Sequence, residues 1–268
     1  MDKSTSKQAS KQASRLIFKS LLVLLFLAPS NAHADLMFGL VGWWRLQDGA
    51  IGTTCAGASV ADSSGQGNTG TCNNSPIYVL GMRKEGLSLN GINNYISIPK
   101  STNLNNIGTI FTVSTWVNPS AIPNNSQWFT VGSDQTGQGW GITLGTASSN
   151  TLVGAMVIGG VAYNSPSYTA STGNWYNVIL IRNGTTASFY VNGTQVGSSF
   201  IVPSGNVRSY GNAPTYIGDV YSYNNYYNGI IDDVRIYNRA LSAQEVVDLY
   251  NSGASINNGS LNNFKLDQ

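Results

Sequence analysis

The loop that runs from Cys55 to Cys72, CAGASVADSSGQGNTGTC, combines residue types found in several kinds of binding loop. Gly65, Gly67 and Gly70 match G-x-G-x-x-G, the spacing with which a glycine-rich turn can cradle a pyrophosphate. A phosphate loop of that kind follows a buried strand and opens a helix. Here the motif follows only SVAD and leads into TCNNSP, which cannot open a helix. The context argues against a phosphate site and leaves a metal loop or a plain glycine-rich turn.

Oxygen-bearing side chains in this loop and near the C-terminus could hold a calcium ion. Asp62 and Asn68 offer oxygen ligands within the loop, where small residues also expose backbone carbonyls. Asp232 lies in the strand-like run GIIDDVRIY, and alternation places it on the same face as Val234 and Ile236. A carboxylate on an apolar face must be paired or heavily hydrogen-bonded, because an unpaired buried charge is unfavourable. We therefore predict a structural calcium site formed by these three oxygen-bearing residues.

The same residues also have a purely structural interpretation. Asp62 would cap a turn of the loop, and Asp232 would pair with Arg45 or Arg235. Melting of the protein with and without a chelator separates the two interpretations, since only a metal site responds to chelation.

Aromatic side chains are the other feature that could bind a ligand, because an exposed ring can stack on a sugar. The run DVYSYNNYYNG combines tyrosines with asparagines just before GIIDDVRIY, and such loops also suit protein partners. Trp128 and Trp140 bracket the loop GSDQTGQG and are further candidates. A structural or merely solvated loop is the alternative. The tyrosine candidates are Tyr221, Tyr223, Tyr226 and Tyr227.

Catalytic chemistry has little support in this sequence. The only histidine is His33, in the N-terminal segment considered next, so a Ser-His-Asp or Cys-His nucleophile and a His-bearing zinc site are excluded beyond it. A glycosidase needs two carboxylates facing one cleft. Beyond residue 34 the glutamates are Glu85 and Glu245, and alternation sends the adjacent Asp232 and Asp233 to opposite faces. We expect no enzymatic activity and no catalytic residue.

The first 34 residues have the pattern of an export signal. Five Lys or Arg residues precede an apolar run at 21–28 and an A-x-A cleavage pattern at 32–34. The apolar run is too short to span a bilayer comfortably. We expect the mature chain to begin near Asp35 and to be secreted, periplasmic or at the cell surface, without membrane insertion after cleavage. An uncleaved N-terminal anchor is the alternative.

Charge and cysteine content restrict the partners further. Residues 35–268 carry nine Lys or Arg against eleven Asp or Glu, a net charge of −2, so no positive stripe favours nucleic acid. In an exported chain, Cys55 and Cys72 most simply pair as a disulfide. The bridge would close a loop of about 18 residues and stabilise the fold by about 3 kcal/mol. Two free thiols are the alternative.

Most of the chain has the pattern of strands joined by tight turns. Short apolar or alternating runs, bounded by Gly, Asn or Pro, recur at intervals typical of an all-β sandwich or barrel. Asn183-Gly184 and Asn192-Gly193 are hairpin signals. The run VILI at 178–181 is apolar at every position, which suits a strand buried on both faces.

One helix is expected near the C-terminus. Ser242 and Glu245 form a capping box, and Leu241 and Val246 stand at the positions of a hydrophobic staple. Gly253 is placed to end the helix. We expect a flexible tail over residues 254–268, because this segment is rich in Asn.

Four segments together resemble the LamG-like jelly-roll family, which has the concanavalin A-like lectin/glucanase architecture. They are GLVGWWRLQDG (39–49), ADSSGQGNTG (61–70), GLSLNGINNYISIP (86–99) and GIIDDVRIYNRALSAQEVVDLY (229–250). The resemblance implies two antiparallel sheets packed face to face, a structural calcium ion, and binding to glycans or to other proteins. It also implies that Asp62 and Asp232 are metal ligands and that Asn68 matches the loop asparagine.

The resemblance and the residue patterns lead to one expectation. The fold is all-β, a two-sheet antiparallel jelly-roll sandwich over residues 35–253 with one short C-terminal helix. The function is that of an exported non-catalytic module that binds a glycan and contains calcium. The alternative function is cell-surface adhesion or assembly through contacts with an envelope protein, without sugar specificity.

Overall fold

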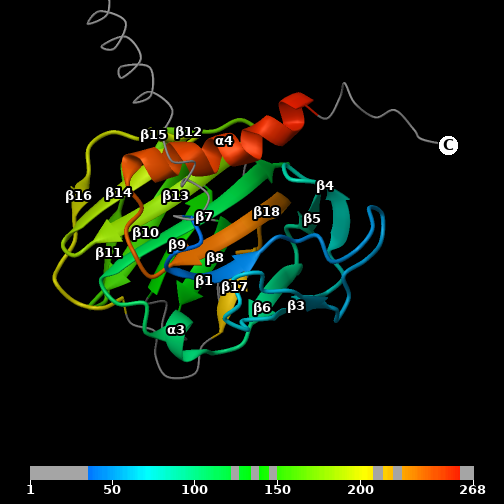
Figure 1. Cartoon of the computed structure of the whole chain (residues 1–268), viewed down its shortest axis with the longest axis horizontal. Helices are drawn as coiled ribbons and strands as arrows, with labels where there is room; N and C mark the ends of the chain where they lie inside the picture. The colour runs from blue at the N-terminus through cyan, green and yellow to red at the C-terminus, as the bar shows by residue number, and fades with distance from the viewer. Residues whose placement is uncertain are drawn as a thin grey trace, which may run out of the picture. The chain divides into compact units, whose positions relative to one another are not determined.

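The computed structural model describes residues 36–121, 127–133, 139–144, 150–207, 214–219 and 225–259, without the side chains of 127–133, 144 and 254–259. The expected signal peptide, Tyr221 and Tyr223 lie outside the described residues. Residues from Leu36 onward form one compact unit, in which two antiparallel sheets face each other and a helix covers one of them (Figure 1). This confirms the expected all-β jelly-roll sandwich with a C-terminal helix.

The sheet beneath the helix, sheet A, has the strand order β15-β14-β13-β7-β18-β5-β4, and β1 and β16 pair with β18 and β14. Its strands are β1 (Leu40–Trp44), β4 (Ile77–Leu80), β5 (Glu85–Asn90), β7 (Ile110–Pro119), β13 (Tyr176–Asn183), β14 (Thr186–Val191), β15 (Thr194–Gln195), β16 (Phe200–Ile201) and β18 (Asn228–Tyr237).

The second sheet, sheet B, has the order β11-β10-β9-β8-β17-β6-β3-β2, and β12 pairs with β10. Its strands are β2 (Ser59–Val60), β3 (Gly70–Asn73), β6 (Tyr95–Ile98), β8 (Gln127–Ser133), β9 (Gly139–Leu144), β10 (Thr151–Ile158), β11 (Val161–Asn164), β12 (Tyr168–Thr169) and β17 (Thr215–Ile217). A single helical turn, α3 (Thr102–Asn105), follows β6.

Strand β13 shows why the chain needs two apolar cores. Val178 and Leu180 point into the main core between the sheets, while Ile179 and Ile181 point into a second core on the outer face of sheet A. All four side chains are buried, which confirms the prediction for the run 178–181. The hairpin signals are also confirmed, because Asn183-Gly184 joins β13 to β14 and Asn192-Gly193 joins β14 to β15.

Helix α4 (Ala243–Gly259) closes the second core from outside. The capping box is confirmed: the Ser242 amide donates to Glu245 Oε2 at 2.8 Å, and the Glu245 amide donates to Ser242 Oγ at 3.3 Å. Both staple residues, Leu241 and Val246, are buried in the second core.

The predicted helix end at Gly253 is wrong, because α4 continues to Gly259, six residues into the segment expected to be a flexible tail. Gly253 has a packing role instead. A Cβ atom at this position would lie 2.6 Å from the indole Nε1 of Trp116 on β7. The glycine therefore allows the helix backbone to approach the outer face of sheet A. Its role is close packing and not the end of the helix.

Candidate binding sites

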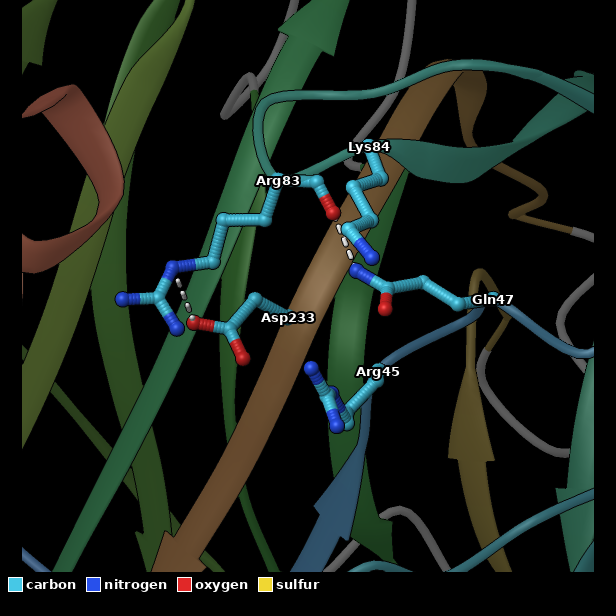
Figure 2. A pocket seen from close by; sticks show the side chains of 5 residues that line it. All are labelled: Arg45, Gln47, Arg83, Lys84 and Asp233. Carbon is cyan, nitrogen blue, oxygen red and sulfur yellow. Dashed lines mark hydrogen bonds and ion pairs between the residues drawn. The ribbon is translucent and has the colours of Figure 1, made fainter. Parts of the chain in front are cut away.

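Strand β18 changes partner halfway along one of its edges, and this seam positions a cluster of charged side chains. On that edge β5 pairs with residues 228–231 and β1 pairs with residues 234–237, while β7 pairs along the other edge. Asp232 and Asp233 lie at the change of partner. The chain leaving β1 brings Arg45 to the same place, and the β4–β5 turn brings Arg83 (Figure 2).

The seam contains a β-bulge that corrects a prediction made from alternation. Between Asp232 and Arg235 the pairing with β7 shifts by one residue, and Asp233 has a φ of 50°. Ile231 and Val234 both point into the main core, so the two residues between them face outward. Asp232 therefore does not share the face of Val234, and Asp232 and Asp233 do not point to opposite faces, because the extra residue resets the alternation.

Asp233 is buried and is held by hydrogen bonds to one oxygen and ion pairs to the other. Its Oδ1 accepts hydrogen bonds from Trp43 Nε1 at 2.6 Å and from Arg235 Nε at 3.1 Å. Its Oδ2 lies 3.1 Å from Arg235 Nη2 and 3.4 Å from Arg83 Nε. Burial by itself would raise the pKa of Asp233, but Arg235 and Arg83 outweigh it and lower that pKa, so the carboxylate is ionised.

Asp232 is buried beside this cluster, and its pKa is shifted in the opposite direction to that of Asp233. Its Oδ2 accepts the Arg83 amide at 2.6 Å, and a side chain on Gly81 would collide with the same oxygen at 2.7 Å. Glycine at position 81 thus lets the β4–β5 turn close over the carboxyl group. Burial first and the neighbouring Asp233 second raise the pKa of Asp232 to about 7.

The Asp62 carboxylate accepts backbone amides of the cysteine-bounded loop and of β1. Its Oδ1 accepts the backbone amides of Trp43 and Ser64, both at 2.9 Å, and its Oδ2 accepts the Asn68 amide at 2.8 Å. The Asn68 side chain is buried and donates to the Val41 carbonyl at 2.6 Å. The loop is therefore tied to β1 by its own hydrogen bonds, which matches the structural alternative for Asp62.

The structure does not bring the three predicted calcium ligands together. Strand β1 lies between Asp62 and β18, because Asp62 bridges to Trp44 while Trp44 pairs with Val234. Asp232 also interacts with Arg83, whose positive charge opposes a cation at this carboxyl group. Among the described residues, no group of three or more His, Cys, Asp or Glu side chains could hold a metal ion. Asp62 and Asp232 thus lie on opposite sides of β1, and a calcium ion held by Asp62 and Asn68 in this loop stays a prediction.

The base of the Asp62 loop is covalently closed. Cys55 and Cys72 form a disulfide with an S–S distance of 2.08 Å, which confirms the predicted pairing. Both cysteines are buried in the main core. The bridge anchors β3 to the segment that precedes β2, so the Asp62 loop starts and ends on a fixed base.

A group of three tyrosines, Tyr95, Tyr216 and Tyr226, forms a second candidate site on the outer face of sheet B, which we call the tyrosine patch. The ring centroid of Tyr95 lies 5.9 Å from that of Tyr216 and 6.1 Å from that of Tyr226. Tyr95 and Tyr226 are half-buried, so their rings are partly accessible. Ser97 and Asn73 lie beside them and are hydrogen-bonded to each other at 3.0 Å. The patch combines aromatic faces with polar groups, as a sugar site requires.

Sequence analysis found only one member of the tyrosine patch, Tyr226. Tyr95 and Tyr216 were missed, although a signal exists in YISI, where Ile96 and Ile98 are core residues and Tyr95 must face outward. The two tyrosines meet because β6 pairs with β17, which lies more than a hundred residues further along the chain.

Two other predicted ligand contacts are wrong. Trp140 is a core residue whose ring packs against Phe111 at 5.7 Å, and Tyr227 is fully buried in the same core. Trp140 lies at an inward-facing position of β9, and Tyr227 immediately precedes β18. Trp128 lies on β8 without a described side chain.

Residues 90–247, more than half of the chain, match the profile of the concanavalin A-like lectin/glucanases superfamily. The chain belongs to this superfamily. A search of curated proteins found no significant match to the sequence.

Solved structures with the superfamily fold are similar in architecture and distant in sequence. The binding domain of Paraclostridial Mosquitocidal Protein 1 aligns with a TM-score of 0.65 at 20% identity, over 81% of this chain and 53% of that one. This chain thus spans about half the length of that toxin domain.

Two further structures with this fold contain carbohydrate-active proteins. Domain 4 of AbnA, an extracellular arabinanase from Geobacillus stearothermophilus solved with arabinotriose, aligns at 0.60 and 22% identity, over 79% of this chain and 98% of that one. Trypanosoma rangeli sialidase aligns at 0.58 and 17% identity, over 79% and 32%. Within the described residues, no helix of this superfamily member is long and apolar enough to cross a membrane.

Proposed function

We propose that this chain is an exported, non-catalytic module that binds glycans through the tyrosine patch. The observation that carries the proposal is the pair of partly accessible rings of Tyr95 and Tyr226, with the buried Tyr216 packed against Tyr95 and hydrogen-bonding side chains beside them. Tyrosine offers a rigid apolar ring and a polar hydroxyl, which together suit the CH face and the hydroxyl groups of a sugar. The fold shared with an arabinanase domain solved with arabinotriose supports a ligand of this class.

The state of the buried acids supports a non-catalytic role. A glycosidase needs one carboxyl group as acid and a second one facing the same substrate. Asp232 and Asp233 face the same side, but both side chains are buried. Asp233 is already held by Trp43, Arg83 and Arg235, and Asp232 lies under the β4–β5 turn. The two carboxyl groups therefore do not form an acid and a second carboxylate that face one substrate.

The competing function is adhesion or assembly through protein contacts. A glycan array separates the two functions, since the proposal requires saturable binding to at least one class of saccharide. Binding to no glycan, together with self-association or capture of an envelope protein, would favour adhesion and sink the proposal.

The tyrosine patch is tested with substitutions that change the ring or only its hydroxyl. Tyr95→Ala should lower affinity for the glycan about tenfold or more, because binding surfaces concentrate their energy in a few aromatic anchors. Tyr95→Phe should retain most of the binding that depends on stacking. Tyr163→Ala is a matched control, since Tyr163 is a half-buried tyrosine on β11, at the far end of sheet B. Equal losses in Tyr95→Ala and Tyr163→Ala would contradict the patch.

Calcium stays a prediction, confined to Asp62 and Asn68 without Asp232. If calcium occupies the loop, EDTA should lower the melting temperature of the wild type, because an ion bound only by the fold stabilises it. An Asp62→Asn variant would lose that response. A melting temperature unaffected by EDTA would leave the loop as a hydrogen-bonded turn.

Export is also part of the proposal and has its own measurement. The protein recovered outside the cytoplasm should begin at or near Asp35, as determined by N-terminal sequencing. A chain that retains Met1 and fractionates with membranes would support the uncleaved anchor.

A further inference from the structure

The seam of sheet A contains a hollow that the tyrosine patch does not use. Its lining consists of Arg45, Gln47, Arg83, Lys84 and Asp233, and its cavity volume is about 50 Å³ (Figure 2). It lies on the outer face of sheet A, whereas the tyrosine patch lies on the outer face of sheet B. The two features therefore form separate surfaces.

The hollow has more positive than negative charge. Asp233 is balanced by Arg235 and Arg83, with which it forms ion pairs. Arg45 and Lys84 are both exposed, and within the described part of the chain neither forms an ion pair with a carboxylate. Of the nine basic residues beyond residue 34, these two together with Arg83 and Arg235 make four at one seam.

Cations crowd together at this seam. Burial lowers the pKa of Arg83, and the charges of Arg235 and Arg45 lower it further, while Asp233 and Asp232 raise it. The guanidinium groups of Arg45 and Arg235 also both lie over the Trp43 ring, 5.2 Å and 4.3 Å from its centroid. Such crowding of cations around one indole leaves a positive potential toward solvent.

The polar walls of the hollow are held in place before any ligand binds. Arg83 Nη2 donates to Ser252 Oγ of α4 at 2.5 Å, and the Gln47 side-chain amide donates to the Arg83 carbonyl. Lys84 follows in the same turn with a φ of 79°, a conformation unfavourable for a residue with a side chain. The side chain of Lys84 is nevertheless directed toward Gln47 (Figure 2).

We infer that this hollow binds the acidic group, a carboxylate or a sulfate, of an anionic saccharide. Arg45 and Lys84 would supply the two uncompensated charges, and the planar guanidinium of Arg45 suits an oxyanion. Gln47 adds a neutral polar group for sugar hydroxyls. That the ligand is a sugar rests on the proposed function. That it carries an anionic group follows from the charges of Arg45 and Lys84, independently of the proposed function.

The test is to titrate the full chain with each probe at low ionic strength and to measure binding by NMR of the probe. The probes are glucuronate, glucose 6-sulfate, glucose, and a glutamate-containing dipeptide. We expect one or both acidic sugars to bind and glucose to bind more weakly at the hollow, with affinity falling as salt is added. The sulfated and carboxylated probes identify which oxyanion is preferred.

Arg45→Gln and Lys84→Gln should each weaken acidic-sugar binding about tenfold, as expected for loss of a charge-assisted contact. Lys100→Gln is the matched control, because it removes the same charge from an exposed position after β6 and should change affinity less than about twofold. Melting curves show whether each variant retains the fold.

Several results would overturn the inference. They are wild-type affinity in both Arg45→Gln and Lys84→Gln, an equal loss in Lys100→Gln, or equal binding of the acidic dipeptide. Binding of neutral glycans to the Tyr95→Ala variant is measured separately. The proposal for the tyrosine patch and the proposal for the hollow can therefore be refuted independently of each other.

Discussion

Asp233 adopts a left-handed backbone conformation at the bulge of β18, and this one residue determines where two carboxyl groups point. Without the extra residue, Asp232 would face the main core beside Val234. With it, Asp232 lies under the β4–β5 turn and Asp233 lies among arginines. The same sequence thus yields two neighbouring acids, one with a raised and one with a lowered pKa.

The raised pKa of Asp232 predicts a particular dependence of stability on pH. The carboxyl group has a pKa of about 7 in the fold and 3.8 as its ordinary value. Between these values the folded state holds a proton that the unfolded state releases, so the free energy of unfolding should fall as pH rises from about 4 to about 7. The slope from one such group is at most about 1.4 kcal/mol per pH unit.

Asp232→Asn should remove this slope, because a neutral amide imitates the protonated carboxyl group. Urea unfolding at a series of pH values measures it, and the variant should be at least as stable as the wild type at pH 8. Asp248→Asn, on the outside of α4, should leave the slope in place. A variant that loses stability at pH 8 would show instead that the fold uses the ionised carboxylate, as a cation site would require.

At the scale of elements, α4 and β18 shape the outer face of sheet A. The helix packs so closely that Gly253 lies against Trp116, whose ring also stacks on Tyr250 at 5.6 Å. Arg83 connects the β4–β5 turn to the same helix through Ser252. The hollow is lined by the segment after β1, the β4–β5 turn and β18, and α4 holds Arg83 of that turn in place through Ser252.

Gly253→Ala should destabilise the fold by about 1–3 kcal/mol, although alanine favours helices more than glycine does. The reason is the collision of the new methyl group with the Trp116 indole. Asn251→Ala, at an exposed position of the same helix, should be neutral or slightly stabilising. Denaturant unfolding compares the two, and a Gly253→Ala variant more stable than the wild type would mean that α4 does not pack on Trp116.

At the scale of the whole molecule, the sandwich presents two different outer faces. Sheet B carries the aromatic tyrosine patch, and sheet A carries the helix and the cationic hollow. The Cys55–Cys72 bridge fixes the segment between them, since it joins β3 of sheet B to the chain that arrives from β1 of sheet A.

Removing this bridge should lower the stability of the whole sandwich. A Cys55→Ala, Cys72→Ala variant should lose about 3 kcal/mol of unfolding free energy, since the bridge restricts a loop of about 18 residues in the unfolded chain. Reductant should destabilise the wild type by a similar amount and leave the variant unchanged. A wild type insensitive to reductant under unfolding conditions would contradict a stabilising role.

Local features were predictable from the sequence because they depend on neighbours in the chain. The Asn-Gly hairpins, the capping box at Ser242 and the doubly buried run at 178–181 require only a turn, a cap or a hydrophobic pattern within a few residues. The disulfide was predictable because the chain offers one pair of cysteines. The superfamily was likewise recognisable from segments whose order is written in the sequence.

The sites depended on contacts that no local pattern contains. The bulge at Asp233, the close approach that needs Gly253, and the meeting of Tyr95 with Tyr216 all join residues brought together by strand pairing or packing. Alternation along a strand predicts a face only while the ladder is regular, and one inserted residue reverses it. For this reason the sequence by itself determined the sandwich and its turns, whereas the tertiary structure decided which side chains form the tyrosine patch and the hollow.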